Sequence, residues 1–196
     1  RYMRKKILFL AGMMACCSLA GAQEISKTWV ADKGNGTYQN PVLHADYSDP
    51  DVCAAGDDFY MTASSFNCIP GIPILHSNDL VNWSLVNCAL PVQESEEFFD
   101  KAQHGKGVWA PAIRFHNGEF YIYWGDPDYG IYMIKAKDPK GRWTKPVLVK
   151  AGKGMIDPTP LWDEDGKVYL VHAYAGSRSG VNSIVVICEL NAEGTE

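Results

Sequence analysis

Residues 40–52 read NPVLHADYSDPDV, a stretch that holds three carboxylates, Asp46, Asp49 and Asp51, directly before a strand-like run. So many acidic side chains in one short segment of a β-rich protein indicate a functional site. The ring of Pro50 disfavours the α conformation for the residue before it. Asp49 is therefore predicted to be an extended or turn residue at the entrance to a strand.

The pattern around Asp49 returns twice along the chain. A second Asp-Pro pair, Asp157-Pro158, precedes a later strand-like run, and Trp109-Ala-Pro111 stands at the matching place between the two. A single Asp-Pro pair marks a turn and needs no further explanation. The recurrence instead favours a repeated structural unit, in which Asp49, Trp109 and Asp157 occupy matching places.

Strand signals dominate the chain from residue 39 onward. Short runs rich in β-branched and aromatic residues are bounded by Gly, Asp, Asn or Pro, which is typical of strands. Hairpin turns are predicted between paired runs, at Gly56-Asp57-Asp58, Asn117-Gly118 and Asp165-Gly166. The fold class is therefore all-β.

The strands fall into two full units and most of a third, starting near residues 49, 110 and 157. Repeats of ~40–50 residues with four strands each are typical of a β-propeller. A sandwich of hairpins would explain the strands but not their recurring order. We predict about three propeller blades, whose inner strands bring Asp49, Trp109 and Asp157 to one central channel.

The N-terminal residues 1–22 are predicted to be a signal peptide. Basic residues precede the apolar run of residues 7–15, and the small residues 20–22 offer a cleavage site. The run is short for a membrane span, although an uncleaved anchor is the alternative. Residues 23–38 are interpreted as a leader or linker and 39–196 as the domain. We expect an exported protein, periplasmic or secreted, with no membrane span after cleavage.

Charge restricts the class of partner. The 196-residue chain has a net charge of −5, and loss of residues 1–22 leaves 14 basic and 23 acidic residues, a net charge of −9. Nucleic acid is therefore not an expected partner. Aromatic residues are interleaved with acidic and small ones, as in sites for neutral polar ligands.

Cysteine and histidine spacing gives no metal motif. Four cysteines follow the predicted cleavage site, and the five histidines are scattered, so no zinc site is expected in this segment. We expect buried free thiols, with a Cys68–Cys88 bridge as the alternative. The other two cysteines are Cys53 and Cys188.

The motifs NPVLHADYSDPDV, GDDFYMTASSF, GVWAPAIRFHNGEFYIYW and IDPTPLWDEDGKVYLV resemble glycoside hydrolase family 43. This family contains five-bladed propeller β-xylosidases and α-L-arabinofuranosidases, and the resemblance runs from Asn40 to the end of the chain, as the N-terminal part of the family's domain. It implies hydrolysis of glycosidic bonds with inversion, in pentose-containing plant polysaccharides or oligosaccharides. By position Asp49 resembles the general base and Asp157 the aspartate that tunes the general acid.

The family's acid lies in a Glu-Gly-Pro segment, which Glu193-Gly-Thr-Glu196 does not match. We therefore expect a truncated chain that lacks the C-terminal blades and the acid and is nearly inactive alone. No cofactor is expected in this segment, although the resemblance allows a calcium ion in the full-length enzyme. The alternatives are a non-catalytic carbohydrate-binding propeller and a related fructan-cleaving propeller with a nucleophilic aspartate.

Substrate contacts are also suggested by the resemblance. Trp109 and Phe66 resemble the family's aromatic sugar contacts, with core packing as the alternative for each. Arg178 is predicted to reach the channel and bind sugar hydroxyls or the Asp157 carboxyl. Residues 124–129 are interpreted as a loop at the rim of the pocket, where Trp124 and Tyr129 face the sugar and Asp126 or Asp128 bonds a hydroxyl; turn chemistry explains this loop as well.

Overall fold

The computed structural model describes residue 26 and residues 28–67, 69–93 and 96–196. Residues 31–196 form one compact unit. The predicted signal peptide and Cys68 lie outside the described residues. In the described part of the chain, no helix is long and apolar enough to cross a membrane.

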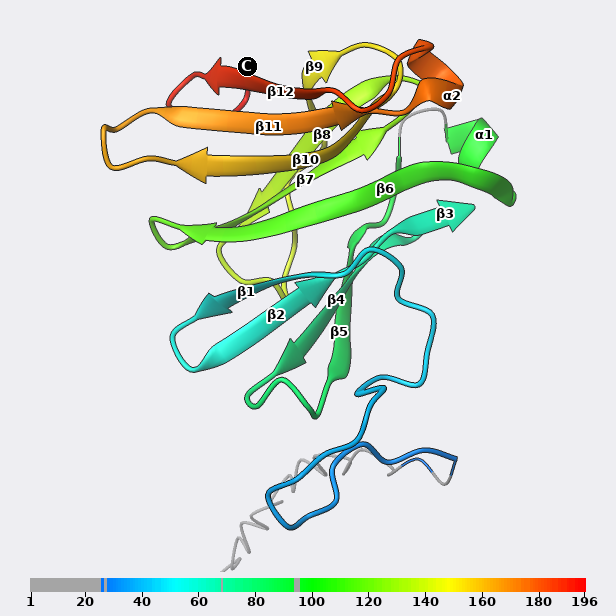
Figure 1. The fold of residues 1–196 in the computed structure, drawn as a ribbon, viewed down its shortest axis with the longest axis vertical. Coiled ribbons are helices and arrows are strands. Elements are labelled where there is room, and N and C mark those ends of the chain that lie inside the picture. Colours follow the sequence, from blue (N-terminus) through cyan, green and yellow to red (C-terminus); the bar gives the residue numbers. More distant parts are fainter. Residues whose placement is uncertain (1–25, 27, 68, 94–95) are drawn as a thin grey trace, which may run out of the picture. The chain divides into compact units, whose positions relative to one another are not determined.

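Three antiparallel sheets follow one another along the chain (Figure 1). The first sheet contains β1 (Asp51–Ala55), β2 (Asp58–Thr62), β4 (Gly71–Ser77) and β5 (Ser84–Leu90). The second contains β3 (Ser65–Asn67), β6 (Gln103–His116), β7 (Glu119–Asp126), β8 (Gly130–Ala136) and β9 (Val147–Ala151). The third contains β10 (Met155–Trp162), β11 (Val168–Tyr174) and β12 (Val185–Leu190). Two short helices lie between strands, α1 (Glu96–Phe99) and α2 (Gly176–Ser179).

The sheets are successive blades of a β-propeller, so the predicted all-β fold class is confirmed. Each blade is a meander, and the inner strand β6 contacts both β1 and β10, the inner strands of its neighbours. The prediction missed β3, a strand of three residues that leaves the first blade and pairs with the start of β6. Three residues are too few to show the alternation of apolar and polar side chains from which a strand is predicted, so only the pairing with β6 identifies this strand.

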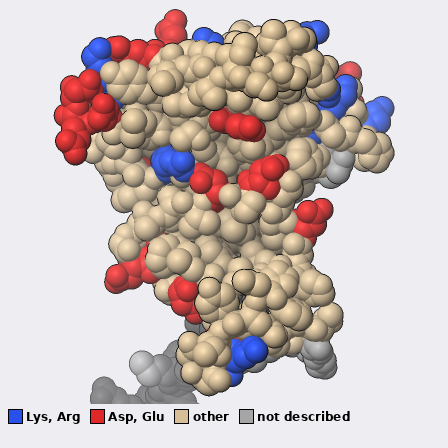
Figure 2. Space-filling view, viewed as in Figure 1, with Lys and Arg blue, Asp and Glu red and all other residues tan. Residues whose placement is uncertain are grey.

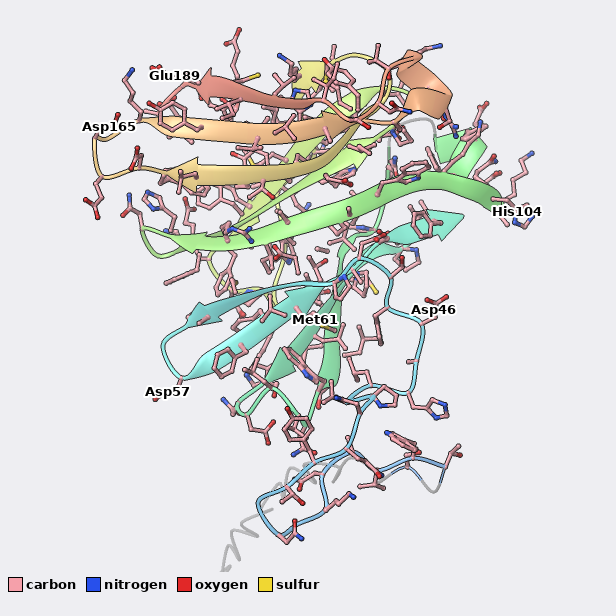
Figure 3. All side chains as sticks on the ribbon, viewed as in Figure 1. Asp46, Asp57, Met61, His104, Asp165 and Glu189 are labelled. Atoms are coloured by element: carbon pink, nitrogen blue, oxygen red, sulfur yellow. The ribbon has the colours of Figure 1, made fainter. Side chains whose placement is uncertain are left out.

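The hairpin turns lie where the sequence predicted them. Asn117 and Gly118 have φ of 48° and 78° and join His116 to Glu119, which is the left-handed geometry of a two-residue hairpin. In Figure 3, Asp57 and Asp165, which belong to the turns of the first and third blades, lie on one side of the sheets, and His104 at the start of β6 lies on the other.

The residues that precede Pro50, Pro111 and Pro158 share an unusual backbone. Asp49, Ala110 and Asp157 have φ of 50°, 37° and 55°, so of the two conformations predicted for Asp49, extended or turn, the structure shows a left-handed turn conformation. Bulges interrupt the pairing of β6 and β10 at these positions, and a bulge permits this conformation and re-aims the side chain. Ala110, not Trp109, is therefore the counterpart of the two aspartates.

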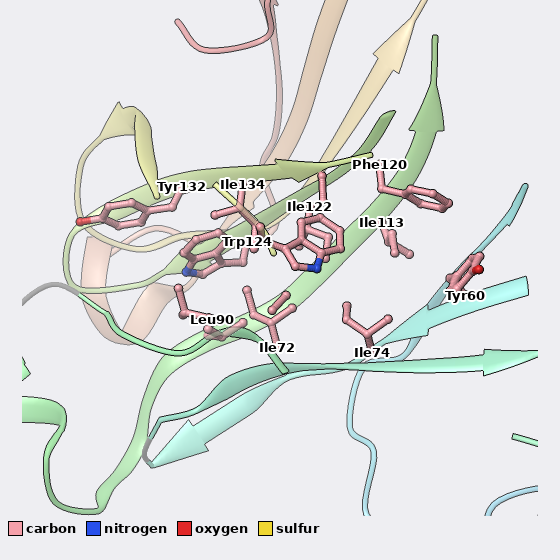
Figure 4. Close-up of a cluster of buried hydrophobic side chains, with 14 residues drawn as sticks. Tyr60, Ile72, Ile74, Leu90, Ile113, Phe120, Ile122, Trp124, Tyr132 and Ile134 are labelled. Atoms are coloured by element: carbon pink, nitrogen blue, oxygen red, sulfur yellow. The ribbon is translucent and has the colours of Figure 1, made fainter. Parts of the chain in front are cut away.

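Two apolar cores join the blades. The first lies between the first two blades and includes Ile72 and Ile74 of one and Ile122 and Trp124 of the other (Figure 4). The second lies between the second and third blades, around Tyr123 and Leu170. Each blade therefore depends on its neighbour for burial of its apolar face.

A polar contact also joins the first two blades. Asp51 Oδ2 accepts the Ile113 N–H at 2.8 Å and pairs with the Arg114 guanidinium. Of the three carboxylates in the opening motif, Asp51 therefore has a structural role between blades.

Three cysteines in the described residues, Cys53, Cys88 and Cys188, are free thiols and half-buried. Burial raises the pKa of the Cys53 thiol to about 12, which leaves this thiol unreactive at neutral pH. The alternative Cys68–Cys88 bridge involves a residue outside the described ones.

Candidate active site

One cavity collects most of the predicted site residues. It has a volume of about 410 Å³ and is lined by Asp49, Phe66, Gly105, Trp109, Ala110 and Asp157. These residues come from all three blades: Asp49 lies directly before β1, the inner strand of the first blade, and Asp157 lies near the start of β10, the inner strand of the third. The volume lies in the range of small-ligand pockets.

Asp49 is held by two hydroxyl groups. Ser48 Oγ and Ser64 Oγ donate to the same carboxylate oxygen, Oδ2, at 2.9 and 2.7 Å. The Ser64 hydroxyl also accepts the N–H of Ala110 at 2.8 Å, so it joins the first blade to the second. Neither serine was predicted as a site residue. Ser48 precedes Asp49 directly, but Ser64 is brought near only by the fold.

Asp157 faces an environment that favours its protonated form. Burial and then the negative charge of Asp49 raise the pKa of the Asp157 carboxyl above its ordinary value. The two aspartates are thus electrostatically coupled across the cavity. Two carboxyl groups facing one cavity are a common arrangement for acid–base chemistry.

Two aromatic rings form a wall of the cavity. The rings of Phe66 and Trp109 lie edge to face, with centroids 6.1 Å apart. Phe66 pairs with Gly107 in the β3–β6 ladder, and the Trp109 indole N–H donates to the carbonyl of Gly105 at 3.2 Å. A Cβ at Gly107 would lie 3.2 Å from the Ser65 carbonyl oxygen, and its φ is 94°, so glycine suits this close ribbon. The cavity wall therefore depends on a strand that the sequence did not predict.

Arg178 lies over Trp109 but is not one of the residues that line the cavity. Its guanidinium carbon is 5.6 Å from the centre of the indole ring, and its Nε is 3.1 Å from Oδ1 of Asp128. The predicted partner Asp157 lies in the cavity, whereas the observed ion pair is with Asp128.

The residues of the loop predicted at the rim of the pocket differ in how far they are buried. Trp124 is fully buried in the first core, so a role as a rim residue is wrong for it. Asp126 is 2% exposed and bonded to Gln93, so it is also unavailable to a sugar hydroxyl. Tyr129 is exposed, and Asp128 is engaged with Arg178.

Among the described residues, no set of three or more His, Cys, Asp or Glu side chains is arranged to hold a metal ion. The calcium ion suggested for the full-length protein remains a prediction.

The space-filling view shows a mainly uncharged face with a few acidic side chains near its middle (Figure 2).

Fold and site together define a β-propeller with two carboxyl groups and two aromatic rings in one cavity near its inner strands. The model of glycosyl hydrolases family 43 matches residues 38–196. The chain belongs to this family.

Relatives support the assignment. A β-xylosidase of Formosa agariphila is 34% identical over 189 residues, which cover 89% of this chain and 32% of that protein. A non-reducing-end α-L-arabinofuranosidase of Bacteroides ovatus is 37% identical over 139 residues, covering 69% of this chain and 26% of that protein. The solved structure of a GH43_12 protein from a capybara gut metagenome has a TM-score of 0.65 and 33% identity, and covers 79% of this chain and 30% of that one. The chain spans about a third of the length of the curated relatives it matches.

Proposed function

We propose that the full-length protein hydrolyses glycosidic bonds in pentose-containing plant polysaccharides or oligosaccharides, with inversion of configuration. The observation that carries this proposal is the cavity in which Asp49 and Asp157 meet two aromatic rings. Relatives named as a β-xylosidase and an α-L-arabinofuranosidase support the substrate class. The predicted signal peptide supports an exported enzyme, periplasmic or secreted.

Asp49 is proposed as the general base. Its Oδ2 accepts two hydroxyl hydrogen bonds, which orient the carboxylate so that Oδ1 can take a proton from water. The water oxygen then forms a bond to the anomeric carbon as the bond to the leaving oxygen breaks. The leaving oxygen takes its proton from a carboxylic acid on the opposite side of the sugar, which inverting enzymes place ~6.5–9.5 Å from the base.

Asp157 is proposed as the residue that tunes and orients that acid. Burial and then the negative charge of Asp49 raise the pKa of its carboxyl group. The acid itself is proposed to be a glutamic acid, which is not among the residues that line this cavity. Loss of such a proton donor typically reduces the rate ~10²–10⁴-fold.

Phe66 and Trp109 are proposed to bind the apolar face of a pentose ring, since their rings form the wall of the cavity. Arg178 is proposed to contribute to substrate binding with the guanidinium N–H groups that Asp128 does not use. The resemblance to family 43 supports these roles, and the geometry is compatible with them.

The test is hydrolysis of 4-nitrophenyl β-D-xylopyranoside and 4-nitrophenyl α-L-arabinofuranoside by the full-length protein. Asp49→Asn should reduce kcat at least ~10²-fold, because the base is lost while the shape is kept. Asp46→Asn is the matched control, because Asp46 is an exposed carboxylate of the same motif. NMR of the first-formed sugar anomer distinguishes inversion from retention.

Two outcomes would contradict the proposal. If Asp49→Asn kept more than a tenth of the wild-type turnover, Asp49 would not be the base. If the wild type bound xylo-oligosaccharides in calorimetry without cleaving any of them, the carbohydrate-binding propeller would be the better interpretation.

A further inference from the structure

Three charged side chains from separate segments meet beside the aromatic wall. Asp128, in the turn between β7 and β8, pairs with Arg178 of α2 at 3.1 Å. Its other carboxylate oxygen lies 4.0 Å from Nζ of Lys106 in β6. The Arg178 guanidinium lies over the indole of Trp109, within the distance at which cations are attracted to aromatic faces.

Backbone hydrogen bonds hold the segments that carry Asp128 and Arg178 in place. The N–H of Gly154 donates to the Pro127 carbonyl, and the carbonyl of Gly154 accepts the N–H of Ala175, both at 2.7 Å. A Cβ at Gly154 would lie 2.7 Å from Cβ of Ser179, so no other residue fits between the turn and α2 without movement. The turn of the second blade and the helix of the third are therefore joined through one glycine.

The buried carboxyl group of Asp126 supports the turn that carries Asp128. Asp126 is 2% exposed; its Oδ1 accepts the N–H of Asp128 at 3.0 Å and its Oδ2 accepts Nε2 of Gln93 at 2.9 Å. A Cβ on Gly107 would lie 3.7 Å from the Gln93 side chain, so Gln93 lies beside the ribbon that carries Trp109. Polar contacts of Asp128 thus connect the β7–β8 turn both to β6, which carries Trp109, and to α2.

From this geometry we propose that Asp128 is a positioning residue, which holds the Arg178 guanidinium over Trp109 and thereby fixes one wall of the cavity. Its effect on catalysis rests on the proposed function, because it assumes that the Trp109 ring binds substrate. Its effect on the ring itself does not. Asp128 touches neither the cavity nor the reacting atoms and acts only through Arg178.

The experiment uses the full-length protein labelled with 5-fluorotryptophan, and Trp109→Phe assigns the ¹⁹F resonance of the ring. Asp128→Asn should shift or broaden this resonance, because the ring loses its fixed cation. For the nitrophenyl pentoside that the wild type hydrolyses, KM should rise roughly fivefold, with kcat within about twofold, since a contact of about 1 kcal/mol is loosened.

The matched control is Glu119→Gln. Glu119 pairs with Lys135 at 2.9 Å, its side chain is 25% exposed compared with 29% for Asp128, and it lies at the other end of β7. This variant should change neither the Trp109 resonance nor KM. Asp128→Glu, which retains the charge, should restore part of the wild-type signal. Arg178→Lys should shift the resonance even if Asp128→Asn fails to fold.

The inference is overturned if the Trp109 resonance in folded Asp128→Asn matches that of the wild type, or if Glu119→Gln shifts it equally. A fall in kcat at unchanged KM would also overturn it, because a looser wall weakens binding. If the resonance responds but the wild type cleaves no pentoside, the positioning role holds and the proposed function fails.

Discussion

The Ser64 hydroxyl lies 2.7 Å from Oδ2 of Asp49, fifteen residues earlier in the chain. The same hydroxyl accepts the N–H of Ala110 in the second blade. One side chain therefore fixes the orientation of the proposed base and joins the first two inner strands. Ala110 also has the left-handed backbone of Asp49 and Asp157, so the bulge that interrupts β6 places its N–H within reach of Ser64.

Ser64→Ala should therefore impair both stability and turnover. The Ala110 N–H loses its acceptor and the Asp49 carboxylate loses a donor, which predicts a decrease of about 1–3 kcal/mol in the free energy of unfolding. Turnover should fall roughly tenfold, because the carboxylate can rotate. Urea unfolding and nitrophenyl pentoside hydrolysis measure the two effects. Ser64→Thr, which keeps the hydroxyl, is the control, and equal losses in both variants would argue against the hydrogen bond as the cause.

The pKa of Asp157 should depend on the charge of Asp49. Because the charge of Asp49 is one cause of the raised pKa of Asp157, Asp49→Asn should lower the pKa of Asp157. Titration of the ¹³Cγ resonance of Asp157 by NMR measures this. Asp46→Asn should leave it unchanged. An unmoved Asp157 pKa in Asp49→Asn would mean that burial alone raises it.

The raised pKa of Asp157 also has a consequence for stability. A carboxyl group whose folded-state pKa lies above its unfolded value contributes stability below the unfolded pKa and loses it as the pH rises through the folded pKa. Asp157→Asn should therefore gain stability relative to the wild type as the pH rises from about 4 to 7. Thermal unfolding at several pH values is the measurement. A difference that does not change with pH would contradict the raised pKa of Asp157.

The pH dependence of stability should be larger for Asp126 than for Asp157, because the Asp126 side chain is buried. Burial raises its pKa to about 6, so ionisation of the folded protein near neutral pH is unfavourable. Asp126→Asn should remove a pH dependence worth at most about 3 kcal/mol between pH 4 and 8. The free energy of unfolding of the wild type should thus fall relative to the variant as the pH rises through 6. Urea unfolding at pH 5 and 8 tests this, with Glu119→Gln, at a half-buried carboxylate, as the control.

Asp51 should matter for stability rather than for chemistry. Asp51→Ala leaves the Ile113 N–H without its acceptor and the Arg114 guanidinium without its carboxylate. The free energy of unfolding should fall by about 1–3 kcal/mol. Glu119→Ala, which breaks an ion pair of similar exposure without a backbone partner, should lose less than about 1 kcal/mol. Equal losses would show that the inter-blade N–H bond contributes little.

Much of the fold was predictable because its signals are local. Alternating short runs and hairpin turns predicted the strands, and the recurrence of Pro50, Pro111 and Pro158 predicted the blades. The strand β3 was missed because pairing with β6 defines it rather than any pattern in its three residues. Trp124 was assigned to the rim because an aromatic residue beside a turn looks the same whether it faces solvent or the neighbouring blade. Burial between two sheets decides the case.

By itself, the sequence determined the all-β class, the order of the blades and the identity of the two carboxylates that line the cavity, since each of these depends on neighbouring residues or on a repeat. Only the tertiary structure decided that Ala110 is the counterpart of the two aspartates, that Ser64 holds Asp49 and that Arg178 pairs with Asp128 instead of Asp157. The physical reason is distance along the chain. The two side-chain contacts join residues 15 and 50 positions apart. The first closes across the β1–β2 hairpin and the second links the β7–β8 turn to α2, so both form only once the blades have folded and packed.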